Sequence, residues 1–97
     1  MSAGSRRLER KSLDRQRIDK WLWHARMVRT RNDAAALTTA GFVRVNGKRM
    51  TAASHLVRIG DVVTLALDRS VRVVRVDGIC ERRGSAPSAR MLYRDMG

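Results

Sequence analysis

Positively charged side chains are the most abundant chemically active groups in this sequence. Twenty-one Lys and Arg residues against nine Asp and Glu residues give the 97-residue chain a formal charge of +12. Eighteen of the 21 cations are arginine, whose guanidinium group forks onto phosphates and stacks on bases. So large an excess of one sign attracts polyanions, most commonly nucleic acids. The composition therefore indicates a protein that binds nucleic acid.

Eight residues stand where the sequence pattern favours contact with phosphates. Five surround the first predicted helix and the start of the second: Arg17, Lys20, Arg29, Arg31 and Asn32. Three surround a predicted hairpin turn at Asn46-Gly47: Arg44, Lys48 and Arg49. A hairpin tip that carries cations can reach a groove of A-form RNA, where shape and backbone are read rather than sequence. The alternative for both groups is an ordinary solvated surface, and the one-signed charge favours phosphate contact.

Few residues could carry other kinds of chemistry. One cysteine, Cys80, and two histidines, His24 and His55, predict neither an internal disulfide nor a four-ligand metal site. We expect both histidines on the surface or half-buried, and Cys80 as a small hydrophobic residue in a strand. No partner for catalysis is spaced to work with Asp19, so its expected role is an ion pair with a nearby arginine. We therefore expect no enzyme activity, no cofactor, no metal and no small-molecule substrate.

The few aromatic residues divide between two expected environments. Trp21 lies on the apolar stripe of the first predicted helix and is expected in the core, whereas Trp23 lies on the opposite face. Trp23 either covers a small apolar cluster beneath the C-terminal segment, with Leu92 and Tyr93, or offers a platform for base stacking. The first interpretation is favoured. No apolar run is long enough to span a membrane, and the first residues do not read as a secretory signal.

Helical periodicity occupies the first half of the chain. The apolar spacing predicts a helix over residues 19–28. Residues 30–33 favour a helix cap, and the alanine-rich residues 34–40 predict a second helix that ends at a left-handed Gly41. The polar residues 1–16 predict a basic, flexible N-terminal arm.

After the second helix the apolar residues recur at every second position, as in β-strands. Strands are expected at residues 42–45, 48–50, 62–67 and 71–76, with a further short one at Ile79-Cys80. Arg72 and Arg75 are expected to keep the outer face of the late strand soluble, and Ser85 or Ser88 to cap a last helical turn through residues 91–93. Two packed helices followed by a small, mostly antiparallel sheet of about four short strands make an α+β fold.

Several short motifs follow one another in a specific order. They are residues 17–22 (Arg-Ile-Asp-Lys-Trp-Leu), Thr30-Arg31, residues 40–47 (Ala-Gly-Phe-Val-Arg-Val-Asn-Gly) and Ile59-Gly60-Asp61. This set resembles the S4, or αL, RNA-binding domain. Residues 19–26 and 81–86, with Leu92-Tyr93, are similar to the ribosome-associated heat shock protein 15 family. The resemblance covers roughly residues 17–94 and implies an S4-like RNA-binding domain over residues 17–97, with a short C-terminal segment.

The resemblance also implies a function and partners. We expect a cytoplasmic, stress-response monomer that binds ribosomal RNA on the large ribosomal subunit and acts in ribosome quality control. There it would recycle or rescue stalled complexes of nascent chain and tRNA, with tRNA as a further candidate contact. Two alternatives stay open. One is the RNA-targeting domain of an RNA-modifying enzyme, against which the short chain argues; the other is a general basic binder of RNA or DNA.

Overall fold

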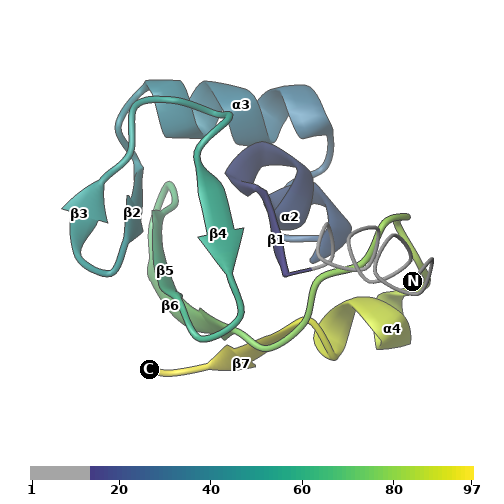
Figure 1. Cartoon of the computed structure of the whole chain (residues 1–97). Helices are drawn as coiled ribbons and strands as arrows, with labels where there is room; N and C mark the ends of the chain where they lie inside the picture. Colours follow the sequence, from purple (N-terminus) through teal and green to yellow (C-terminus); the bar gives the residue numbers. More distant parts are fainter. Residues whose placement is uncertain (1–13) are drawn as a thin grey trace, which may run out of the picture.

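A five-stranded antiparallel sheet lies on one side of two packed helices, with a two-stranded ribbon beside them (Figure 1). This computed structural model describes residues 14–97. In chain order the elements are β1 (Arg15–Arg17), α2 (Ile18–His24), α3 (Arg31–Thr39), β2 (Val43–Val45), β3 (Lys48–Arg49), β4 (Leu56–Arg58), β5 (Val62–Ala66), β6 (Val71–Val76), α4 (Ala86–Arg90) and β7 (Tyr93–Asp95). The predicted α+β class is confirmed.

The strands outnumber the four that were expected. The main sheet has the order β3-β2-β5-β6-β7, and β1 pairs with β4 in a separate ribbon, every pair being antiparallel. The strands β1, β4 and β7 have three residues each, too few to show a two-residue period in the sequence. Arg15 and Gln16, which the sequence placed in the N-terminal arm, belong to β1, and residues 1–13 of that arm lie outside the described part of the chain.

The first helix is shorter than predicted. It ends at His24 because Arg26 adopts the left-handed conformation, with a φ of 59°. The N–H groups of Arg26 and Met27 donate to carbonyls of the last turn, which is the bond pattern of a Schellman cap. The Arg26 guanidinium also donates to the C=O of Gly84 (2.9 Å), and this tertiary bond helps to hold a non-glycine residue in that conformation.

The second helix begins earlier than predicted and ends where expected. Thr30 is its N-cap, because the Thr30 hydroxyl accepts a hydrogen bond from the N–H of Asp33 (3.0 Å). Residues 31–33 are therefore helical rather than part of the connection. At the other end Gly41 has a φ of 89° and closes a second Schellman cap, as the sequence predicted.

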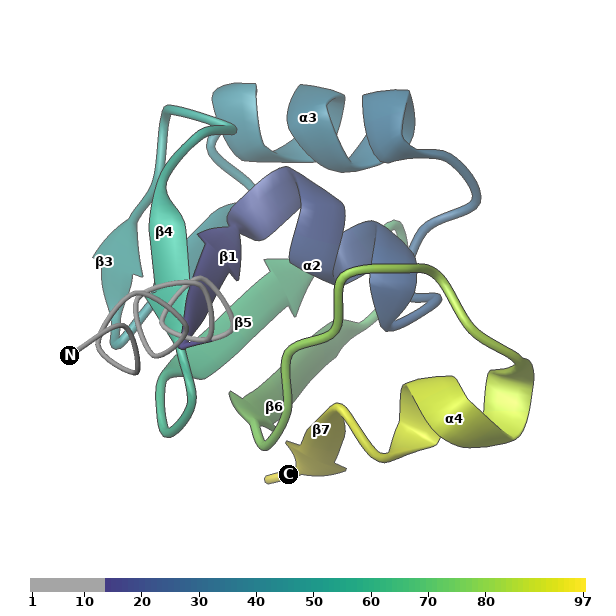
Figure 2. The ribbon, with the colours of Figure 1, turned by 45° about the vertical axis from the view of Figure 1, so that its right-hand side comes forward.

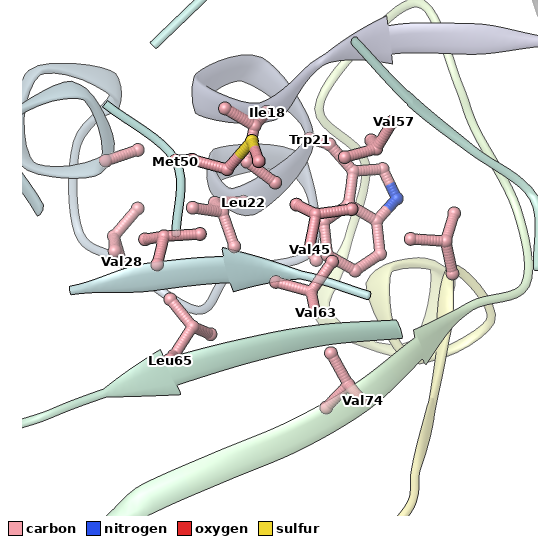
Figure 3. Close-up of a cluster of buried hydrophobic side chains, with 14 of the residues drawn as sticks. Ile18, Trp21, Leu22, Val28, Val45, Met50, Val57, Val63, Leu65 and Val74 are labelled. Atoms are coloured by element: carbon pink, nitrogen blue, oxygen red, sulfur yellow. The ribbon is translucent and has the colours of Figure 1, made fainter. Parts of the chain in front are cut away.

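The hydrophobic core lies between α2 and the inner face of the main sheet. Trp21 and Leu22 on α2 lie over Val63, Leu65 and Val74, and all of these side chains are fully buried (Figure 3). Burial of each side chain of this size stabilises the fold by roughly 1.5–3 kcal/mol. Figure 2 shows α3 on the side of α2 that faces away from the sheet. The core position expected for Trp21 is confirmed.

Residues 77–85, here called the strap, run along α2 without regular structure (Figure 2). The predicted strand at Cys80 is therefore wrong. The C=O of Cys80 instead accepts a hydrogen bond from Gln16 Nε2 (2.7 Å) and lies 3.0 Å from Nδ1 of His24. His24 is only 1% exposed, so the expected surface position is wrong for it and holds only for His55, which is exposed. A contact between residues so far apart leaves no local pattern in the sequence.

Arg72 and Arg75 do not share the outer face of β6. They are three residues apart, so they point to opposite faces of the strand. Arg72 lies opposite Leu65, on the inner side, and pairs with Asp95 (2.9 Å), whereas Arg75 pairs with Asp77 (2.8 Å). Both arginines are half-buried, so the prediction that both keep the outer face soluble is wrong, and ion pairing is their observed role.

The hydrogen bond from Trp21 Nε1 to the C=O of Gly78 (2.9 Å) ties the strap to the core. Trp21→Phe keeps an aromatic ring but leaves this carbonyl without its donor. We expect the free energy of unfolding to fall by about 1–3 kcal/mol, the cost of an unpaired buried polar group. Trp23→Phe is the matched control and should change stability by less than about 0.5 kcal/mol, because that ring is half exposed. Equal losses in urea denaturation would contradict this role of the strap.

Candidate nucleic-acid interface

A buried carboxylate organises the basic residues at the start of α2 and α3. Asp19, 3% exposed, accepts hydrogen bonds from Arg17 through Nε (3.2 Å) and Nη2 (3.1 Å). Arg31 Nε lies 3.5 Å from Oδ2 of the same carboxylate. The predicted ion pair of Asp19 with an arginine is confirmed. Both arginine side chains stay nearly half exposed, at 47% for Arg17 and 41% for Arg31, and each guanidinium has five N–H groups, more than the Asp19 carboxylate takes up.

The remaining predicted residues of this region extend the same basic surface. The set Arg17, Lys20, Arg29, Arg31 and Asn32 is called the helix cluster below. Lys20 is half-buried on α2, Arg29 is exposed in the connection between the helices, and Asn32 is exposed in the first turn of α3. The charge of Arg31 at the N-terminal turn of α3 adds to the partial charge of the free N–H groups there, and Asp33 in the same turn offsets part of this positive potential. This arrangement suits a phosphate group.

The hairpin residues form a second group, the hairpin cluster Arg44, Lys48 and Arg49. Asn46 (φ 52°) and Gly47 (φ 81°) both have the positive φ of a tight hairpin turn, as predicted. Arg44 and Arg49 lie directly opposite each other across β2 and β3. Lys48 pairs with Val45 and therefore points to the other face of the hairpin.

A shallow hollow of about 250 Å³ lies beside the two hairpin arginines. Its lining includes Arg44, Arg49, Thr64, Gly41 and Phe42. A Cβ atom at Gly41 would lie 3.3 Å from Cδ of Arg49, so this glycine allows the arginine to lie close to the end of α3. The hollow thus combines two guanidinium groups and a hydroxyl.

The structure keeps the two clusters apart. The helix cluster stands at the first turn of α3, and the hairpin cluster stands beyond its last turn, next to Gly41. The nine residues of α3 separate these ends by roughly 14 Å, at 1.5 Å per residue. The eight predicted residues therefore lie in two separate groups rather than in one continuous surface.

A third group of cations, a pair of arginines, was not predicted from the sequence. Arg15 on β1 and Arg58 on β4 lie directly opposite each other in the two-stranded ribbon, and both are exposed. These short strands show no periodicity, so nothing in the sequence indicated that the two arginines meet.

The side chain of Asn46 joins the hairpin turn to the turn before β5. Asn46 Nδ2 donates a hydrogen bond to Asp61 (3.1 Å), and Asn46 Oδ1 accepts one from the N–H of Val62 (2.9 Å).

The separate apolar cluster expected for Trp23 with Leu92 and Tyr93 is not present, because Leu92 belongs to the main core and both Trp23 and Tyr93 pack against it. The ring of Trp23 is half-buried and packs against the core. The guanidinium of Arg83, from the strap, lies 5.4 Å from the ring centre, and Arg83 Nε donates to the C=O of Trp23 (3.2 Å). A base would have to displace this cation to stack on the same face.

Residues 14–97 contain no reactive thiol, no cluster of metal ligands and no helix that could span a membrane. Burial raises the pKa of the Cys80 thiol, which keeps it protonated and unreactive near neutral pH. Within that part of the chain, no three His, Cys, Asp or Glu side chains lie together where they could hold a metal ion. In the same part, every helix is too short or too polar to cross a bilayer.

Known proteins share this fold and these motifs. The family model of the S4 domain matches residues 16–63. The heat shock protein 15 homolog of Haemophilus influenzae is 33% identical over 79 residues, which are 81% of this chain and 60% of that protein. The solved trimeric structure of Vibrio cholerae heat shock protein 15 has a TM-score of 0.79 and 36% identity, and covers 84% of this chain and 82% of that one. The chain belongs to the heat shock protein 15 family.

Membership of the heat shock protein 15 family confirms the predicted S4-like fold. The chain is also similar to the small ribosomal subunit protein uS4 of an Anaeromyxobacter species. The two are 39% identical over 71 residues, which are 70% of this chain and 34% of that protein. The chain spans about three fifths (60%) of the Haemophilus relative that it matches. Its site residues and its particular RNA therefore rest on the geometry above.

The ion pairs of Asp19 lead to a prediction about RNA affinity. Loss of the negative charge and loss of the oriented arginines should change that affinity in opposite directions. Asp19→Asn removes a negative charge, which by Coulomb attraction alone would strengthen RNA binding. We expect RNA binding to weaken instead, by roughly 3- to 10-fold, because Arg17 and Arg31 lose the group that orients them. Asp95→Asn is the control, since it makes the same charge change at an exposed pair with Arg72. Stronger binding in both variants would contradict the orienting role of Asp19.

His24 generates a prediction about pH. Burial lowers the pKa of His24 below its usual 6.5, and the charges of Lys20, Arg31 and Arg83 lower it further. As the pH falls through 6.5, the unfolded chain takes up a proton at this position that the folded chain resists, so stability decreases.

We expect the urea midpoint to fall between about pH 7.5 and about pH 5.5, and His24→Gln to remove that part of the pH dependence. His55→Gln, at an exposed position, should leave the dependence as it is in the unmodified chain. A pH dependence that persists in His24→Gln would assign it to other groups.

Proposed function

We propose that this chain binds ribosomal RNA through the helix cluster and the hairpin cluster. The observation that carries this proposal is the pair Arg44 and Arg49. The two residues lie directly opposite each other in the hairpin, where like charges repel and destabilise the strand pair. Neither has a carboxylate partner within residues 14–97, and Arg44 makes only a long bond to the C=O of Gly47 (3.4 Å). A phosphate in the adjoining hollow relieves this repulsion.

The mechanism is geometric and electrostatic. Two groups of arginines, one near each end of the roughly 14 Å long helix α3, meet the backbone of a folded RNA at a set spacing. The frame between them is a packed helix and a short hairpin, so little ordering is needed on binding. Such a surface reads the shape of structured RNA rather than its base sequence.

The expected cellular role follows from the family. We propose that the RNA lies on the large ribosomal subunit, in the cytoplasm, and that the chain acts in recycling or rescue of stalled complexes of nascent chain and tRNA. The proposed action is docking without catalysis, and tRNA is a candidate second contact. We propose a monomer as the binding unit, because a single chain carries both clusters; the Vibrio cholerae relative is described as trimeric.

A second candidate, general binding of RNA and DNA, is favoured by the net charge of +12. Competition by ribosomal RNA, tRNA and duplex DNA at equal ionic strength distinguishes the two functions. Preference for ribosomal RNA supports the proposal, and equal potency of the three competitors contradicts it.

The salt dependence of binding tests the hairpin contacts. With five or six phosphate contacts, the logarithm of the affinity should fall with the logarithm of salt concentration with a slope of roughly −4 to −5. Arg44→Gln with Arg49→Gln should reduce the steepness of this slope by about 1.5, at 0.7–0.9 per lost phosphate contact. The same double variant should not lower the free energy of unfolding, because it removes a repulsive pair.

The matched control is Arg82→Gln with Arg90→Gln, which removes the same charge from two exposed arginines outside both clusters. The control should leave the slope within about 0.5 of the unmodified chain. If the two double variants change the slope equally, binding depends on net charge and not on the proposed surface.

A further inference from the structure

A half-exposed phenylalanine marks the border between two kinds of surface. On one side of Phe42 lies the hollow with Arg44 and Arg49. On the other side lie two adjoining hollows of about 490 and 450 Å³ that share Leu37 and Phe42. The apolar residues that line these two hollows are called the Phe42 patch: Ala36, Leu37, Ala40, Phe42, Ala66 and Leu67.

The backbone holds the Phe42 patch in place. Phe42 follows the left-handed Gly41, and its N–H donates to the C=O of Leu37 (3.0 Å) in the Schellman cap of α3. Its C=O accepts a hydrogen bond from the N–H of Ala66 at the end of β5 (2.9 Å). The ring is nevertheless 51% exposed, so a rigid backbone presents a large apolar side chain to solvent.

The two hollows of the Phe42 patch differ in charge from the neighbouring hollow of Arg44 and Arg49, which shares Ala40, Phe42 and Ala66 with the patch. No lysine or arginine of residues 14–97 lines either hollow, although that part of the chain carries 17 of them. The charged residues that do line them are Asp33 in one hollow and Asp68 in the other. Within the described residues, Asp19, Asp77 and Asp95 pair with arginines, whereas neither Asp33 nor Asp68 has such a partner.

Two carboxylates at the edge of an apolar surface repel phosphates and attract cations. We propose that the Phe42 patch binds a protein segment in which an apolar side chain is flanked by lysine or arginine. The inference rests on the proposed function, because the segment would belong to a basic protein of the ribosomal subunit, next to the bound RNA. RNA contacts would then end at Arg44 and Arg49, and protein contacts would begin at Phe42.

Reversal of one carboxylate separates protein contact from RNA contact. Asp68 is exposed between β5 and β6, and Asp68→Lys adds positive charge that can only help RNA binding. We expect this variant to bind purified large ribosomal subunits about 5-fold more weakly, while its affinity for protein-free ribosomal RNA stays equal or rises. Glu81→Lys is the matched control, with the same charge change at an exposed residue outside both hollows.

The two variants, each measured with both probes, distinguish the Phe42 patch from an effect of net charge. Weaker binding to subunits by Asp68→Lys alone supports the patch, and equal behaviour of the two variants on both probes overturns it. If the unmodified chain binds neither probe, the proposed function fails together with the patch. Thermal unfolding establishes that both variants are folded.

A photo-crosslinking residue tests the identity of the neighbour independently. Phe42→p-benzoylphenylalanine, bound to large subunits and irradiated, should form an adduct with a ribosomal protein. The crosslinked peptide of that protein should contain lysine or arginine beside an apolar residue. Crosslinks to ribosomal RNA alone, or to a second copy of this chain, would overturn the inference.

Discussion

The buried carboxylate of Asp19 joins the segments on which the helix cluster stands. Its oxygens contact Arg17 from β1 and Arg31 from α3. The backbone N–H of Asp19 donates to the C=O of Ala53 before β4 (3.3 Å). A carboxylate so far removed from water is costly unless it is paired, and the N–H of Lys20 (2.7 Å) completes its set of donors. One residue therefore sets the distance between two arginines that are far apart in the sequence.

The net charge of +12 restricts how so small a chain can be stable. Three of its carboxylates, those of Asp19, Asp77 and Asp95, neutralise arginines locally. The two that line the Phe42 patch, Asp33 and Asp68, have no such partner within residues 14–97. The few acidic residues thus reduce the repulsion among the arginines at some places on the surface and not at others.

Features that depend on neighbouring residues could be predicted from the sequence. Asn46-Gly47 forms the expected tight turn because both residues tolerate positive φ, and Gly41 ends α3 for the same reason. Trp21 reached the core because its helical spacing placed it on the apolar stripe. The end of α2 was missed because Arg26 occupies a position that usually belongs to glycine, with the strap supplying a compensating bond.

Features that depend on distant residues could not be predicted in this way. The strap contacts α2 through His24 and β1 through Gln16, which are separated from Cys80 by 56 and 64 positions. The ribbon of β1 and β4 brings Arg15 and Arg58 together although neither strand has a recognisable pattern. In both cases the pairing partner lies outside any window in which periodicity is measured.

The sequence by itself determined the sign of the charge, the presence of α2 and α3 though not all of their ends, the tight turn and the family resemblance. These follow from composition and from preferences that act within a few residues. Only the tertiary structure decided which cations share a surface. It placed Arg17 and Arg31 on one carboxylate, set Arg44 opposite Arg49, and put the acidic border beside Phe42. Electrostatic recognition depends on distances between side chains, and those distances are set by how the core packs the separate elements together.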